Sequence, residues 1–211
     1  MVRNSLLFTI GFFVLAGLAL LTQHASARSV SYVVRGPVKA APALFLAGLS
    51  WYVNGPPLLT VAFLLCAFGD ILLDMAKSGF MWAFEAGVVM FAAALICLSF
   101  VYLSKPLPNH PLLTLSLPNI VLSLFVCLWV LPNVKRSRQI PAVAYLCLLV
   151  ASNIIASTSL VLVFLGSTLW LLSDLAIAIS RNIPGTPANA LTNLGLYDLG
   201  LYFIALGFLN S

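Results

Sequence analysis

Residues 58–75 read LLTVAFLLCAFGDILLDM, an apolar stretch long enough for a membrane span that nevertheless carries two aspartates. A spanning helix needs about 20 mainly apolar residues. Seven further stretches meet that description: residues 5–23, 35–53, 80–103, 112–131, 140–156, 159–180 and 193–209. Short polar or Pro/Gly-rich breaks separate them, the weakest lying between the sixth and the seventh stretch. The pattern predicts an all-α, polytopic membrane helix bundle of about eight transmembrane helices, with residues 1–211 forming one domain.

The composition agrees with this fold class. The chain of 211 residues is 62% hydrophobic and only 7% charged, whereas soluble domains are about 25% charged. The formal net charge is +5, which in a membrane protein is mainly an orientation signal. The densest basic run, Lys135 to Arg138, is too short to suggest nucleic-acid binding, so no nucleic-acid partner is expected.

The first apolar stretch has a second interpretation. Arg3, the apolar run and the small residues Ala25, Ser26 and Ala27 resemble a signal peptide with its cleavage site. Cleavage would leave seven spans in the mature protein.

Lysine and arginine are distributed unevenly between the two sides of the predicted bundle. The loops after the first, third, fifth and seventh helices, with the adjoining helix ends, define the odd-loop side. Eight basic residues lie there: Arg28, Arg35, Lys39, Lys77, Lys135, Arg136, Arg138 and Arg181. Only Arg3 and Lys105 lie on the other side. The positive-inside rule places the odd-loop side in the cytoplasm. We expect a multi-pass protein of a bacterial inner membrane whose site faces the cytoplasmic leaflet.

Asp70 and Asp174 are the two acids set deepest in these apolar stretches. A carboxylate in hydrocarbon is costly, so such a residue is a functional-site hypothesis by default. The alternative is a structural acid paired with a buried cation, or one that reaches the interface. Asp70 precedes Lys77 by seven residues, and Asp174 precedes Arg181 by seven. At 1.5 Å per residue both acids lie about 10 Å inside a basic boundary, so they could meet in one cavity on the odd-loop side.

Other polar residues lie on the same side. Asp74 shares a helix face with Asp70 at a spacing of four residues; it is either part of a site or a solvated interfacial acid, and Glu85 has the same two interpretations. Asp198 could instead be favoured by the N-terminus of the last helix. Lys39 is a snorkelling interface marker, a phosphate-binding cation or the partner of a buried acid.

Two carboxylates in a low-dielectric pocket can take different protonation states and so provide one acid and one base. That arrangement suits protonation of a substrate and activation of water. The four cysteines form no CxxC pair, and the two histidines lie near segment ends, so we expect neither a metal nor another cofactor. The alternatives are a small proton-coupled transporter and a lipid-binding or assembly protein whose acids are structural.

Several motifs resemble the YhhN-type lysoplasmalogenase family of integral membrane proteins. They are Lys39 with Pro42, AFGDILLD at 67–74, Gly87 with Phe91, IPAVAY at 140–145, LWLLSDLAIAISR at 169–181 and Tyr197. The sequence departs from the family pattern at Leu95, Leu98 and Leu201, where members often carry polar residues.

The resemblance implies hydrolysis of the vinyl ether bond of lysoplasmalogens. The products would be a fatty aldehyde and a glycerophospho-ethanolamine or -choline, and the expected partners are the lysophospholipid substrate and membrane lipids. Asp70 and Asp174 would be the catalytic residues. Lys39, Asp74, Glu85 and Tyr197 would bind substrate, with Lys39 on the phosphate and Tyr197 orienting an acid.

Overall fold

The computed structural model describes residues 5–25, 31–106, 113–186 and 190–209. These residues form eight α-helices: α1 (Ser5–Ala25), α2 (Tyr32–Tyr52), α3 (Pro57–Lys77), α4 (Met81–Leu103), α5 (Ser116–Val130), α6 (Arg136–Ser157), α7 (Val161–Asn182) and α8 (Ala190–Leu209). Short 3₁₀ turns flank α5. The predicted all-α class is confirmed, and the weak break between the sixth and seventh stretches is a true one, because α6 ends at Ser157 and α7 begins at Val161.

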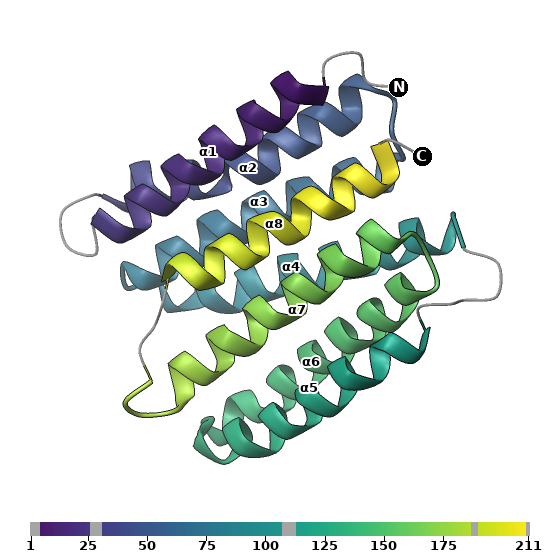
Figure 1. Cartoon of the computed structure of the whole chain (residues 1–211). Helices are drawn as coiled ribbons and strands as arrows, with labels where there is room; N and C mark the ends of the chain where they lie inside the picture. Colours follow the sequence, from purple (N-terminus) through teal and green to yellow (C-terminus); the bar gives the residue numbers. More distant parts are fainter. Residues whose placement is uncertain (1–4, 26–30, 107–112, 187–189, 210–211) are drawn as a thin grey trace.

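The helices run side by side and alternate in direction (Figure 1). The start of α1 and the end of α8 therefore lie at the same end of the bundle, and the odd-loop side is the opposite end. Neighbours in sequence pack together from α1 to α4, α6 packs on both α4 and α7, and α8 returns to α1 and α2. Helix α5 lies against α6 and α7.

Seven of these helices are long and apolar enough to cross a membrane. The eighth, α2, carries Arg35, Lys39 and two internal prolines, Pro37 and Pro42, so its composition is less apolar than that of its neighbours. It nevertheless packs along α1, α3 and α8 over its length. The chain is a multi-pass integral membrane protein.

Helix α6 begins earlier than the sequence predicted. The sixth apolar stretch begins at residue 140, which puts the run from Lys135 to Arg138 in a break between helices, yet α6 starts at Arg136. Gln139 donates hydrogen bonds to the carbonyls of Leu131 and Val134 and so ties this first turn to the end of α5. A helix needs backbone hydrogen bonds rather than apolar side chains, and the exposed basic residues of the first turn can reach the interface.

Helix α1 is packed into the bundle. Phe12, Ala16 and Ala19 are buried, and the Thr9 hydroxyl lies 2.7 Å from that of Tyr202 on α8. The signal-peptide interpretation depends on residues outside the described ones, namely Arg3, Ser26 and Ala27, and Arg28 lies outside them as well.

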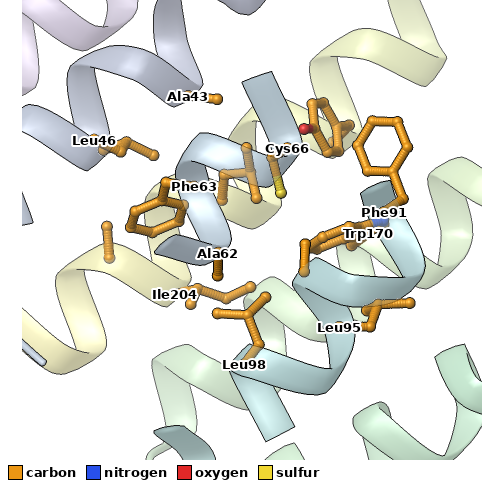
Figure 2. Packing of buried hydrophobic residues seen from close by; sticks show 14 of the residues in the cluster. Ala43, Leu46, Ala62, Phe63, Cys66, Phe91, Leu95, Leu98, Trp170 and Ile204 are labelled. Atoms are coloured by element: carbon orange, nitrogen blue, oxygen red, sulfur yellow. The ribbon is translucent and has the colours of Figure 1, made fainter. Parts of the chain in front are cut away.

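Glycine allows two helix pairs to approach closely. A Cβ atom at Gly166 of α7 would lie 2.5 Å from the carbonyl oxygen of Gly200 on α8, and one at Gly69 of α3 would lie 2.8 Å from the Phe91 ring on α4. Close backbone approach through small residues is a common way for membrane helices to associate. Phe63, Leu98 and other buried apolar side chains pack together in the core of the bundle (Figure 2).

Candidate functional site

A cavity of about 930 Å³ lies on the odd-loop side of the bundle. Both Asp70 and Asp174 line it, although they come from helices far apart in sequence. Lys39, Glu85 and Tyr197 line it as well. Most of the other lining residues also belong to the odd-loop half of their helices: from α3 these are Leu73 and Lys77, and from α7 they fall between Ser173 and Asn182. The structure thus brings five of the six candidate residues to one cavity.

Asp70 is held by an ion pair with α2. Lys39 Nζ lies 2.7 Å from Asp70 Oδ1, and the two side chains are 13% and 2% exposed. Asp70 Oδ2 has no hydrogen-bond partner among the described residues. Of the three interpretations of Lys39, the geometry therefore fits the partner of a buried acid.

Asp74 corrects a prediction. The sequence left it as either a site residue or a solvated interfacial acid, but its side chain is fully buried and lies outside the cavity lining. Arg35 Nε on α2 donates to both of its oxygens, at 2.9 and 2.7 Å. Gln23 on α1 and Lys77 lie at 3.4 and 3.6 Å. Arg35, from the neighbouring helix α2, takes the place of water around the Asp74 carboxylate. The distance of Asp74 from the loop in sequence does not predict this partner.

The two α2–α3 ion pairs form a repeated unit. Arg35 and Lys39 are four residues apart on α2, and Asp70 and Asp74 are four residues apart on α3. Because the two helices are antiparallel, the Arg35–Asp74 pair lies about one helical turn from the Lys39–Asp70 pair. Breaking one buried pair leaves an uncompensated charge, so these contacts fix the rotation of α3 and the direction of Asp70.

Asp174 is held differently, by two neutral donors. The Tyr145 hydroxyl of α6 donates to Asp174 Oδ2 at 2.7 Å, and the Trp170 indole nitrogen donates to the same oxygen at 3.2 Å. No Lys or Arg among the described residues forms an ion pair with it. The sequence did not identify either donor, although Tyr145 ends the IPAVAY motif and Trp170 precedes Asp174 by one helical turn.

Three rings meet beside Asp174 and form the aromatic cluster: Phe91 of α4, Trp170 of α7 and Tyr197 of α8. Their centroids lie 5.6–6.2 Å apart in edge-to-face arrangements, the geometry that ring quadrupoles favour. Figure 2 shows Phe91 and Trp170 next to Leu95 and Cys66 of the apolar core. Phe91 and Tyr197 also line the cavity, whereas Trp170 does not line it and packs against both of them.

Tyr197 and Asp198 are buried in the first half of α8. Tyr197 lies near Asp70 and Cys66, and its hydroxyl has no hydrogen-bond partner among the described residues. Asp198 is 2% exposed, and neither of its oxygens has such a partner. Because Asp198 lies more than two turns into α8, capping of the helix does not explain it. It is outside the cavity lining.

Charged side chains gather at the outer rim of the cavity. Glu85 is 71% exposed and lies 4.0 Å from Arg138. The guanidinium carbons of Arg138 and Arg181 lie 5.5 and 4.8 Å from the centre of the Phe84 ring. Lys77, half exposed, completes the rim.

The three departures from the family pattern lie away from the cavity. Leu95, Leu98 and Leu201 are buried in the apolar core, and none lines the cavity. The three departures therefore do not remove a polar side chain from the cavity lining.

Comparison with curated proteins gives no match, and neither does comparison with solved structures. The model of the YhhN family matches residues 34–208, which include every cavity residue except Gln23. This family includes lysoplasmalogenases. The match covers most of the chain, and the chain therefore belongs to the YhhN family.

Proposed function

We propose that this protein is a membrane-embedded hydrolase that cleaves the vinyl ether bond of lysoplasmalogens, with its site in the cytoplasmic leaflet of a bacterial inner membrane. The observation that carries the proposal is that two acids with different partners line one cavity: Asp70 is paired with a cation, whereas Asp174 is bonded only by neutral groups. Membership of a family that includes lysoplasmalogenases supports the reaction class.

Asp174 is the proton donor in this proposal. Its Oδ2 accepts both hydrogen bonds, from Tyr145 and Trp170, which leaves Oδ1 to carry a proton. Hydrocarbon surroundings without a paired cation favour the neutral acid. The proton is transferred to the alkenyl carbon one bond beyond the ether-linked carbon, and the ether-linked carbon becomes an oxocarbenium centre.

Asp70 is the base. The Lys39 ammonium at 2.7 Å stabilises its carboxylate form, which can in turn stabilise the adjacent oxocarbenium charge. Water bonds to that carbon and loses a proton to Asp70, giving a hemiacetal. Asp70 then returns the proton to the glycerol oxygen as the carbon–oxygen bond breaks, while Asp174 takes the hydroxyl proton. One water is consumed, an aldehyde and a glycerophospho compound are formed, and both acids regain their starting states.

The cavity walls suit a single-chain lipid. Its volume falls within the usual range for ligand sites. An apolar set of side chains from α4, α5 and α6 lines one side: Val88, Val89, Val126, Val130, Val143 and Leu146. Val89 is 61% exposed on the bundle surface, so the cavity reaches the lipid-facing side of α4, where a hydrocarbon chain can extend into the bilayer.

The test is aldehyde release from a lysoplasmalogen by the purified protein. We expect Asp174→Asn and Asp70→Asn to lower kcat by about 10²–10⁴-fold, the usual contribution of a general acid or base. Asp198→Asn is the matched control, because this acid is as buried as Asp70 but lies outside the cavity, and it should retain activity. Folding of each variant is checked by its melting temperature.

Two results would overturn the proposal. One is full activity of folded Asp70→Asn and Asp174→Asn variants. The other is a parent protein that releases no aldehyde but carries protons into proteoliposomes, the behaviour of a transporter.

A further inference from the structure

The phosphate of a lysolipid needs a cation, and the structure leaves Lys39 poorly placed to supply it. Its ammonium is engaged by Asp70 at 2.7 Å at the inner end of the cavity. A phosphate bound there would compete with the carboxylate that the proposed reaction needs. The remaining cations of the cavity are Lys77, Arg138 and Arg181, all at its outer rim.

Arg138 and Arg181 converge on one ring although they come from different helices. Both guanidinium groups lie within 6 Å of the centre of the Phe84 ring, the range of a cation–π contact. Bringing two like charges to one ring is unfavourable unless an anion compensates them. Glu85, at 4.0 Å from Arg138, is the one carboxylate among the described residues that lies within ion-pair range of either group, and it is largely exposed.

Guanidinium groups are well suited to binding a phosphate. Arginine donates two parallel hydrogen bonds to a phosphate, and stacking on an aromatic ring pre-orients its planar fork. The rim thus carries more positive charge than its own carboxylates neutralise, in a geometry suited to a phosphate diester.

The spacing between the rim and the acids matches the lipid. Arg181 follows Asp174 by seven residues on α7, an axial distance of about 10 Å. In a lysoplasmalogen, seven bonds separate the phosphorus from the carbon that is protonated. At roughly 1.2 Å per bond of an extended chain this is about 8 Å, so a phosphate at the rim places the vinyl ether beside the acids.

We infer that Arg138 and Arg181, held on Phe84, bind the phosphate of the lysophospholipid headgroup. The inference rests on the proposed function for the identity of the lipid, but not for the binding of a phosphate. It assigns the phosphate to these two arginines rather than to Lys39.

Binding of an unreactive ligand separates this inference from the reaction. The probe is a 1-acyl lysophosphatidylethanolamine, which has the same phosphate but no vinyl ether, bound to purified protein in detergent and followed by tryptophan fluorescence. Losing a hydrogen bond to a charged group weakens binding by about 10–100-fold, and we expect that loss for Arg138→Gln and for Arg181→Gln. Arg138→Lys and Arg181→Lys keep the charge and should bind at intermediate strength.

Matched controls make the result specific. Arg136→Gln removes an exposed arginine of the same turn that does not line the cavity, and it should bind like the parent. Monoacylglycerol, which lacks the phosphate, should bind the parent and the Gln variants equally. The Lys variants and melting temperatures identify any loss of folding.

Three outcomes would overturn the inference: unchanged lysolipid binding in folded Arg138→Gln and Arg181→Gln variants, an equal loss in Arg136→Gln, or an equal loss of monoacylglycerol binding. If the variants lose affinity for inorganic phosphate but not for the lysolipid, the site takes free phosphate and the lipid assignment is wrong. Loss of lysolipid binding as expected, in a protein that releases no aldehyde, would support the inference while refuting the proposed reaction.

Discussion

Replacement of Lys39 by methionine tests the ion pair on which the α2–α3 contact and the state of Asp70 depend. The two charges are 2.7 Å apart and nearly buried. At an effective dielectric constant of about 20 their attraction is about 6 kcal/mol before desolvation costs. Removing one partner of a buried pair costs about 3–5 kcal/mol because the other charge is left uncompensated. Methionine has nearly the same helix propensity as lysine, so the helix itself is little affected.

The assay is thermal unfolding of the purified protein in detergent. For a chain of this size the loss corresponds to a melting temperature lower by about 6–20 °C. The double variant Lys39→Met/Asp70→Asn removes both charges and should recover most of that loss. The control Arg136→Met removes an exposed cation and should change the free energy of unfolding by less than about 0.5 kcal/mol.

If Lys39→Met melts like the parent protein, the ion pair contributes nothing to stability and the expected loss is refuted. The role of the unpaired carboxylate is refuted if the double variant melts no higher than Lys39→Met. In that case lost packing of the lysine stem, rather than an unpaired carboxylate, would explain the destabilisation.

Two further variants test the helix contact and the acid. Gly166→Ala should lower the free energy of unfolding by about 1–3 kcal/mol, because its methyl group would meet the α8 backbone. The control is Gly195→Ala, which has open space around it and should not lower the melting temperature. Equal melting temperatures of the two variants would contradict the close approach of α7 and α8. Tyr145→Phe removes the 2.7 Å donor to Asp174 and should lower kcat by about 10-fold or more with KM little changed. Tyr52→Phe, on an exposed residue, should leave kcat as it is, and an unaltered kcat in Tyr145→Phe would exclude it from positioning the acid.

The sequence predicted correctly that Asp70 and Asp174 lie at a similar level along the helix axes and can reach one cavity. Counting residues from Lys77 and Arg181 placed Asp70 and Asp174 at the same level, and both do line one cavity. Depth is accessible because a helix rises by a fixed amount per residue, and because basic residues mark the boundary of the apolar layer.

The rotation of each helix about its own axis, which sets the direction in which each side chain points, could not be predicted in the same way. It decides that Tyr145 and Trp170 face Asp174, that Arg35 faces Asp74, and that Glu85 faces outward. Rotation follows from contacts between helices, such as the close approach at Gly166, and one sequence does not specify which helices are neighbours. The burial of Asp74 was missed for this reason, since its partner lies on another helix.

Trp170 has two different kinds of contact beside the site. The indole packs against Phe91 and Tyr197, two rings of the cavity wall, and its nitrogen also donates a hydrogen bond to Asp174. A smaller side chain at this position would remove the packing behind these two rings and at the same time remove one of the two donors that hold the carboxyl. The shape of the cavity wall and the orientation of the acid therefore depend on one side chain, and we expect relatives that use this acid to vary less at position 170 than at the lipid-facing positions of the same helix.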